Sequence, residues 1–346
     1  MNLDDPNLFQ TESHRKVLDE IERLPDSLLE GFAAGKLPDL EPIDGLKSIV
    51  LSGTGNSIIA ADLLAGYLSA LCPLPVSIHR DYSLPAFAAG PGCLVILSSY
   101  SGETEETLSG LEAAVQSKCR ILAVCSGGRL AKETAGAGGQ VWKLEERTAA
   151  LGFSFGLLLA AFQRLGLLPD QETALRTAVD ALRAQQAGLR PDSPVSQNLA
   201  KRMAGQLMGR LVTIFAAGQF VPVARRWKSQ INQLAKSIAQ VETLPEADYN
   251  TLQGASMPEP VLLHSMALFL RAPSDHRQNR LRSNLTRRAL LLEGVNTDFV
   301  DAQGDGPLAH LWTLTHLGEY IAFYLAGAYG VDPTPLPALE NPKSIQ

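Results

Sequence analysis

Residues 94–108 read LVILSSYSGETEETL. The apolar run LVIL predicts a buried β-strand, SSYSG predicts a tight loop at its carboxyl end, and TEETL predicts the start of a helix. A helix start offers unpaired backbone N–H groups and the positive end of the helix dipole, which suit a phosphate group. Ser99, Ser101 and Thr104 add neutral hydroxyl donors. The same hydroxyls could also serve only to cap the helix, so the loop alone leaves both roles open.

Short β-branched runs alternate with helical patterns around this stretch. Strands are predicted at residues 48–52, 75–79, 94–98, 120–124 and 140–143, and helices at 58–68, 104–116 and 129–134. This alternation predicts a parallel sheet with helices on both faces. Ligands of such sheets bind at the carboxyl ends of the strands, where the strand order reverses.

The same pattern restarts in the second half of the chain. It follows a helical region at residues 153–189, interrupted at 168–170, and a linker at 190–194. Strands are predicted at 211–216, 262–270 and 297–301, and helices at 223–236, 280–292 and 308–328. We therefore predict an α/β fold of two doubly wound, three-layer αβα domains in tandem, spanning residues 1–190 and 191–346. The apolar stripe of the last helix could face the core or a dimer partner.

Composition narrows the class of partner. The chain has 346 residues, 45% of them hydrophobic, which fits a globular protein with two cores. Its net charge of -6 argues against nucleic acid, and the basic cluster of Arg225, Arg226 and Lys228 is interpreted as a solvated or phosphate-facing patch. No apolar stretch is long enough to span a bilayer, and the acidic N-terminus has no apolar signal region. We expect no membrane partner and a cytoplasmic location.

The spacing of cysteines and histidines favours structural roles. Neither set shows a metal-ligand pattern, so we expect free thiols, packing or surface histidines, and no metal or other cofactor. The residues concerned are Cys72, Cys93, Cys119 and Cys125, and His264, His276, His310 and His316.

A second loop, SGTGNS at residues 52–57, follows the first predicted strand. A Gly-x-Gly pair here could belong to a dinucleotide-binding motif, but Ile58 stands where the third glycine of that motif belongs. The glycine loop instead supports the same ligand-binding interpretation as the hydroxyl-rich loop, with Gly55, Asn56 and Ser57 as candidate substrate-binding residues.

The sequence resembles the sugar isomerase (SIS) family, and within it the bifunctional phosphoglucose/phosphomannose isomerases. Similar segments are SYSGETEET at 99–107, GTGNS at 53–57, SGGRL at 126–130, RTAALG at 147–152, RWKSQIN at 226–232 and GVDPTP at 330–335. The resemblance implies that Ser99, Ser101 and Thr104 hold the phosphate of a hexose 6-phosphate. It also implies that Arg147 and Lys343 belong to the active site, in a homodimer whose active sites are shared between subunits. The implied reaction is a metal-free aldose–ketose isomerisation.

The chain departs from this family at two positions. The family has a glutamate as general base and, sixteen residues later, a histidine that assists ring opening; this chain has Gln233 and Tyr249. An amide oxygen is too weak a base to accept the C2 proton, and a tyrosine hydroxyl has a pKa of about 10. Loss of a general base typically costs about 10²–10⁴-fold in rate.

Three hypotheses remain open at this point. The protein could be an isomerase that uses another carboxylate, with Glu242 and Glu246 as the nearby candidates. It could be a phosphosugar sensor or regulator without turnover. It could also catalyse a different reaction of a sugar phosphate with Arg147, Tyr249 and Lys343 as its polar groups.

Overall fold

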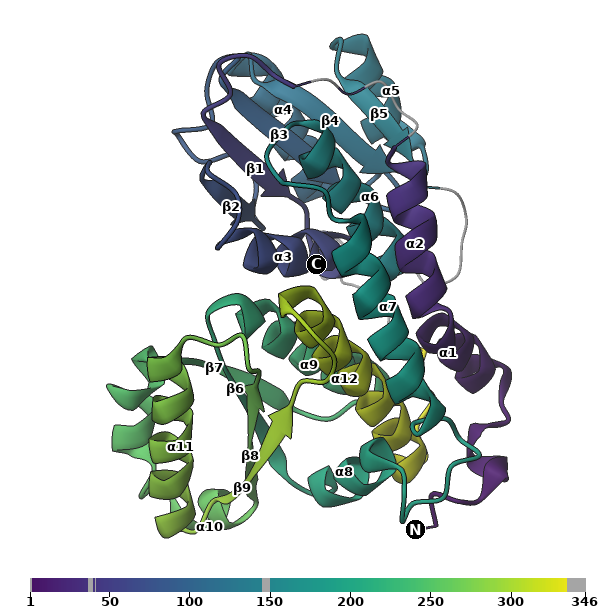
Figure 1. Ribbon diagram of the computed structural model, residues 1–346, viewed down its shortest axis with the longest axis vertical. Helices are drawn as coiled ribbons and strands as arrows, with labels where there is room; N and C mark the ends of the chain where they lie inside the picture. Colours follow the sequence, from purple (N-terminus) through teal and green to yellow (C-terminus); the bar gives the residue numbers. More distant parts are fainter. Residues whose placement is uncertain (1, 37–39, 41, 145–149, 335–346) are drawn as a thin grey trace, which may run out of the picture. The chain divides into compact units, whose positions relative to one another are not determined.

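The structure is a computed structural model that describes residues 2–36, 40, 42–144 and 150–334 (Figure 1). The chain divides into two compact units. The sheet A unit comprises Arg23–Leu182 and Gly304–Leu311, and the sheet B unit comprises Met1–Glu22, Arg183–Gln303 and Trp312–Gln346.

The sheet A unit is built on five parallel strands in the order β2-β1-β3-β4-β5. The strands are β1 (Ser48–Ser52), β2 (Val76–His79), β3 (Cys93–Ser98), β4 (Arg120–Cys125) and β5 (Gln140–Lys143). The accompanying helices are α2 (Leu24–Ala34), α3 (Ile59–Leu68), α4 (Glu105–Gln116), α5 (Gly128–Gly136), α6 (Ala150–Arg164) and α7 (Glu172–Ala187). All six residues of β3 are buried, as its continuous apolar sequence predicts for a central parallel strand.

The sheet B unit contains four parallel strands in the order β7-β6-β8-β9. They are β6 (Leu211–Ala217), β7 (Ala239–Leu244), β8 (Ser265–Arg271) and β9 (Asn296–Asp301). The helices are α1 (Glu12–Glu22), α8 (Leu199–Leu207), α9 (Val221–Leu234), α10 (Glu259–Leu263), α11 (Arg277–Leu292) and α12 (Pro307–Tyr329). In Figure 1, α9 and α12 lie on one face of this sheet and α11 lies on the other. The predicted α/β fold with parallel sheets is confirmed.

Two features of this unit differ in kind from the prediction, namely the start of β8 and the presence of β7. Residues 262 and 263 end the short helix α10, because Pro258 and Pro260 favour a helix start there, and the strand begins only at Ser265. The strand β7 was not predicted. Its sequence AQVETL is largely polar because it is an edge strand that pairs only with β6 and is half-buried along most of its length.

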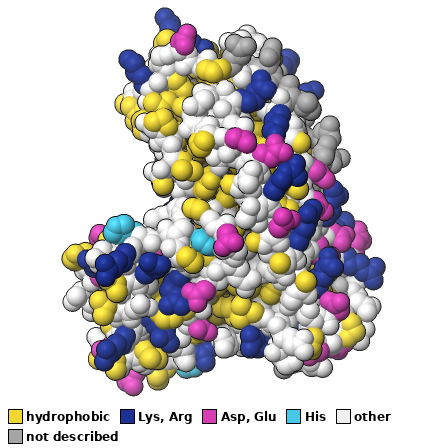
Figure 2. Space-filling view, viewed as in Figure 1, with side chains coloured by type: hydrophobic (Ala, Val, Ile, Leu, Met, Phe, Trp, Pro, Cys, Tyr) yellow, Lys and Arg dark blue, Asp and Glu magenta, His cyan; other side chains and the backbone are white. Residues whose placement is uncertain are grey.

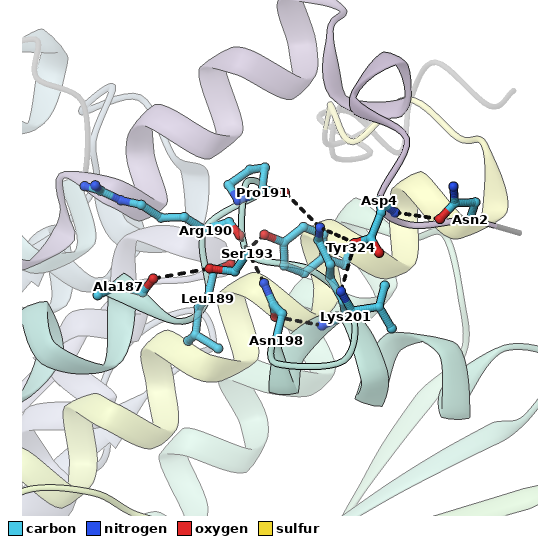
Figure 3. A network of polar contacts seen from close by, with 11 residues as sticks. Asn2, Asp4, Ala187, Leu189, Arg190, Pro191, Ser193, Asn198, Lys201 and Tyr324 are labelled. Carbon is cyan, nitrogen blue, oxygen red and sulfur yellow. Dashed lines mark hydrogen bonds and ion pairs between the residues drawn. The ribbon is translucent and has the colours of Figure 1, made fainter.

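A buried lysine fixes the predicted linker onto the sheet B unit (Figure 3). Lys201 is 1% exposed, and its ammonium group donates to Asp4 Oδ1 at 3.0 Å and to the carbonyl of Pro191 at 2.8 Å. The hydroxyl of Tyr324 donates to the carbonyl of Leu189 at 2.5 Å. A buried ammonium group is tolerated only when it is paired in this way, so the segment after α7 belongs to the packed structure.

The apolar stripe of α12 is part of the core from Trp312 onward. Its members Trp312, Leu314, Leu317, Ile321 and Leu325 are at most 1% exposed, which leaves these side chains no dimer-facing role. Among the described residues, no helix combines the length and the apolar character that crossing a membrane requires.

His316 makes the stability of the protein depend on pH. Its ring is buried in α12, where Nε2 donates to the carbonyl of Ile21 at 3.0 Å, and burial lowers its pKa to about 4. An unfolded histidine has a pKa of about 6.5, so only the unfolded state binds a proton between these values and stability falls as the pH drops through this window. Between pH 7 and 4 we expect the free energy of unfolding to fall by up to about 3 kcal/mol less in His316→Phe than in the wild-type protein.

Urea unfolding of both proteins at a series of pH values between 7 and 4 measures the effect, as the difference between the two curves. Titrating carboxyl groups are common to both proteins and cancel. Parallel curves would show that His316 does not titrate as described.

Candidate functional site

The strand order of sheet A reverses between β1 and β3, the position at which open parallel sheets form a ligand crevice. From β1 the chain moves to β2 on one side, and the later strands β3, β4 and β5 lie on the other. The loops that follow β1 and β3 both lie at the carboxyl end of the sheet at this position, which is where open parallel sheets bind ligands. Residues 53–57 and 99–104 form these two loops, so the structure brings the two predicted binding segments together.

The interior of the 99–104 loop is organised by one buried hydroxyl. Ser99 is fully buried, its Oγ lies 2.8 Å from Thr104 Oγ1, and it accepts the backbone N–H of Gly102 at 3.1 Å. Ser101 is exposed and its Oγ accepts the N–H of Glu103 at 3.2 Å. Ser99 therefore holds the loop in shape, whereas Ser101 and the half-buried Thr104 are accessible to a ligand.

Hydrogen bonds join this loop to the loops of both neighbouring strands. On one side, Ser98 Oγ donates to the carbonyl of Ser57 at 2.7 Å, and Ser57 Oγ accepts the N–H of Tyr100 at 3.1 Å. On the other side, Ser126 Oγ donates to the carbonyl of Tyr100 at 2.6 Å, and the N–H of Arg129 donates to Glu103 Oε1 at 2.8 Å. The three loops thus form one connected rim of hydroxyl and amide groups.

The charge around the rim is balanced locally. Glu105 and Glu106 occupy the first turn of α4, where they already complement the helix dipole. Ligand phosphate contacts are therefore expected from the hydroxyls and the loop N–H groups. Arg80 follows β2 directly and pairs with the buried Asp62 at 2.6 Å. The carbonyl of His79, the residue before Arg80, accepts the N–H of Gly53, which begins the first loop of the rim. Sequence inspection missed this cation because no motif surrounds it.

A second set of predicted residues lies on α9 of the sheet B unit. Arg226 forms a bidentate ion pair with the buried Glu319, with Nε–Oε1 at 2.6 Å and Nη2–Oε2 at 3.1 Å. Gln230 donates to the same carboxylate, and Trp227 Nε1 donates to the carbonyl of Leu314 at 2.8 Å. The expectation that Arg226 belongs to a solvated or phosphate-facing patch is therefore wrong, since this arginine fastens α9 to α12.

Gln233 lies one turn after Gln230, near the end of α9, and is half-buried. Its backbone carbonyl accepts Lys236 Nζ at 2.5 Å, and the same ammonium group reaches the carbonyl of Thr334 at 2.6 Å. The structure thus places a cation, Lys236, beside the position of the family's base, and sequence analysis did not single out this lysine.

The carboxylate of Glu319 also affects a neighbouring acid on α1. Burial and the negative charge of Glu319 raise the pKa of Glu20, while the positive charge of Arg226 acts in the opposite direction.

Tyr249 lies on the opposite face of sheet B from Gln233. It follows the turn that contains Ala247, which packs with Leu244 and with Leu290 of α11, and its side chain is 68% exposed. The strand β7 separates the two positions along the chain, because Gln233 precedes its start and Tyr249 follows its end. Within one chain the structure therefore does not bring Gln233 and Tyr249 together.

The candidate substitute carboxylates share the Tyr249 side of the sheet. Leu244 points into the α11-facing core, so Glu242, two residues earlier on β7, points to the same face. Glu246 lies beyond β7 in the turn before Tyr249 and is exposed. Neither carboxylate is on the face of the sheet that carries Gln233.

The remaining candidates divide into two groups. Arg147 and Lys343 lie outside the described residues. The histidines serve packing and turns: His310 Nε2 donates to Gly304, His264 Nδ1 donates to Pro260, and His276 Nδ1 caps α11 at Gln278. The four cysteines are free thiols, and the described part of the chain contains no group of three His, Cys, Asp or Glu side chains that could hold a metal ion.

The shape of the rim depends on Gly102. Its φ is +72°, and an added Cβ would lie 2.1 Å from the carbonyl oxygen of Gly127. Gly55 has a similar φ of +58° but open space around it, which makes it a matched control. We expect Gly102→Ala to lower the free energy of unfolding by about 3 kcal/mol, and Gly55→Ala by about 1 kcal/mol. Urea denaturation compares the two; equal losses would contradict the described contact with Gly127.

Comparison with known proteins agrees with this architecture. A family described as "Bacterial phospho-glucose isomerase C-terminal SIS domain" matches residues 196–345. The bifunctional phosphoglucose/phosphomannose isomerase of Caldicellulosiruptor bescii is 32% identical over 94% of this chain and 97% of its own. The D-glucosamine-6-phosphate 4-epimerase of Sulfolobus acidocaldarius is 28% identical over 62% of this chain and 66% of its own. A glucose-6-phosphate isomerase like protein from Thermus thermophilus superposes with a TM-score of 0.60 at 22% identity, covering 98% of this chain and 100% of that one. The chain belongs to the bifunctional phosphoglucose/phosphomannose isomerase family.

Proposed function

We propose that this protein binds a hexose 6-phosphate at the crevice between β1 and β3. The observation that carries the proposal is the connected rim of three loops, which presents the hydroxyls of Ser57, Ser101 and Thr104 around the start of α4. Gly55 and Asn56 are exposed on the same rim and are assigned to the sugar. The neutral hydroxyl donors suit a dianionic phosphate, and the buried Ser99 keeps them in position.

We propose that the activity of this protein as an aldose–ketose isomerase is weak or lost. Proton transfer between C1 and C2 needs a general base, and the amide of Gln233 cannot serve as one. Neither Glu242 nor Glu246 is on the same face of sheet B as Gln233, which argues against a simple substitution within one chain. A binding protein that senses or regulates through a phosphosugar is therefore favoured over an efficient isomerase.

The same geometry supports a homodimer if Gln233 and Tyr249 occupy the positions of the family's base and ring-opening group. Gln233 and Tyr249 lie on opposite faces of sheet B, so both can face one ligand only if a second copy supplies one of them. The proposal includes a site shared between two copies and a cytoplasmic location for the protein.

A different reaction of a sugar phosphate is the second candidate. It is favoured by the similarity to a protein named D-glucosamine-6-phosphate 4-epimerase, whose name describes inversion at C4 of an amino sugar phosphate and not aldose–ketose interconversion. In that case Tyr249, Arg147 and Lys343 would form the polar part of the site, with no metal or other cofactor.

Binding can be tested directly at the rim. We expect Ser101→Ala combined with Thr104→Ala to weaken fructose 6-phosphate binding by about 1–3 kcal/mol, because charge-assisted hydrogen bonds to the phosphate are lost. Isothermal titration of the wild-type and variant proteins measures this loss. The half-buried Ser13, whose hydroxyl donates to Asp332, provides a control as Ser13→Ala. Equal affinity in all three proteins, or ligand density at another place in a soaked crystal, would refute the site.

Turnover can be tested by restoring the two family residues. We expect wild-type isomerisation of fructose 6-phosphate to be at least about 10²-fold slower than that of a family member with the glutamate. Gln233→Glu with Tyr249→His in one chain should raise the rate above either single variant in a coupled assay.

A mixture of the two single variants adds a test of the shared site. If each site takes residue 233 from one copy and residue 249 from the other, mixed dimers contain a site with both restored residues, and the mixture should exceed each variant alone. A double variant that binds the sugar phosphate but shows no gain would mean that the base position is misassigned. A gain in the double variant without a gain on mixing would refute the shared site.

A further inference from the structure

A groove between α4 and α5 lies on the surface of the sheet A unit. It has a volume of about 880 Å³. Its apolar lining comes from one face of α4, namely Leu108, Leu111 and Val115. Four carboxylates surround this lining: Glu103, Glu105, Glu112 and Glu133. Among the described lining residues Arg129 is the single basic one, and it pairs with Glu133 at 3.1 Å. The groove is therefore apolar along its floor and negatively charged at its edges.

The outer face of α11 in the sheet B unit has the complementary character. Leu281, Leu285 and Leu292 are 46%, 68% and 78% exposed, and their spacing of four and seven residues puts them on one side of the helix. The exposed Arg277 and Arg288 lie on the same stripe. In the lower left of Figure 2, over the region of α11, dark blue basic side chains lie among yellow hydrophobic ones. We call these five residues the α11 stripe.

An exposed stripe of this kind needs an explanation. The inner side of α11 is already packed, because Thr286 and Leu290 are buried and Arg282 pairs with Asp248 at 2.7 Å. The leucines of the stripe therefore contribute nothing to the core of their own unit. Contiguous exposed apolar side chains bordered by charges are typical of protein–protein contacts.

We propose that the α11 stripe of one copy of this chain docks into the α4/α5 groove of a second copy. The leucines would cover the apolar floor, and Arg277 and Arg288 would meet the glutamates at the edges. The groove's four carboxylates would repel nucleic acid, whereas they attract a basic helix. The helix α11 is also long enough to follow the whole α4 wall, since its 16 residues span about 24 Å and the 12 residues of α4 span about 18 Å.

This inference deepens the proposed self-association, on which it rests, by naming its surfaces. A contact between different patches becomes reciprocal in a closed dimer, where each copy gives its α11 stripe and receives that of the other. The groove shares Glu103 and Arg129 with the rim of the phosphosugar site, so the charge changes are made at other residues and ligand binding is measured separately for each variant.

Two charge-reversed proteins test the contact in the full chain. The first carries Arg277→Glu with Arg288→Glu in the α11 stripe, and the second carries Glu112→Lys with Glu133→Lys in the groove. Each should raise the dimer dissociation constant at least about tenfold in sedimentation velocity at low salt, because like charges would then face each other. Leu285→Ser should weaken association without affecting folding, since its side chain is exposed.

Mixing the two charge-reversed proteins provides the decisive measurement. In a mixed pair, the acidic stripe meets the basic groove and the unchanged stripe meets the unchanged groove, so association should return to nearly the wild-type level. The exposed Arg202 of α8, changed to Glu, controls for the change in total charge. Circular dichroism checks that every variant remains folded.

The outcomes separate the two proposals. Loss of association in each reversed protein with recovery on mixing supports the docking of α11. A wild-type dimer that neither reversal weakens would overturn the docking proposal and leave the homodimer in place. Loss without recovery on mixing would also overturn it. A monomeric wild-type protein would overturn both the docking and the homodimer, while leaving phosphosugar binding to its own titration.

Discussion

The candidate site depends on one close backbone approach, that of Gly102 to the carbonyl of Gly127. The left-handed turn at Gly102 allows the loop after β3 to lie directly against the loop after β4. Backbone contacts between these loops then follow, including the N–H of Leu130 donating to the carbonyl of Gly102 at 3.0 Å. Within the loop, Ser99 Oγ accepts the N–H of Gly102 itself, so the turn and the buried hydroxyl hold each other in place. The binding rim is thus a consequence of strand order and of a turn that only glycine adopts without strain.

In the sheet B unit the corresponding constraint is electrostatic. Arg226 and Glu319 are both almost completely buried, and their bidentate pairing offsets part of the cost of removing two charges from water. Gln230 donates a further hydrogen bond to the same carboxylate. Trp227 packs so closely against Gly318 that a side chain at position 318 would collide with the indole ring. This network sets the position of α9 and thereby that of Gln233. The similarity of this segment to the family's sequence is accounted for by packing, without any catalytic role for Arg226.

Much of the fold was accessible from sequence because burial leaves a clear pattern. The strand at residues 94–98 and the hydroxyl loop after it were predicted where they occur, since a central parallel strand must be apolar on both faces. The edge strand β7 escaped notice because half of its surface is exposed and its residues are correspondingly polar. Likewise, α10 occupies part of a predicted strand, because two prolines decide the local backbone more strongly than the apolar residues around them.

The sequence by itself determined which residue types are available to the candidate site: hydroxyl residues in the loop after residue 98, an amide at Gln233 and a phenol at Tyr249. Those properties belong to single residues and to their spacing along the chain. Only the tertiary structure decided which of these residues meet. It separates Gln233 from Tyr249 by putting α9 and the turn after β7 on opposite faces of sheet B, and it buries Ser99 while exposing Ser101. The physical reason is that residues close in sequence can lie on either face of a sheet when a helix and a strand separate them. The packing of distant residues then decides the face, as Leu290 of α11 does for the turn after β7.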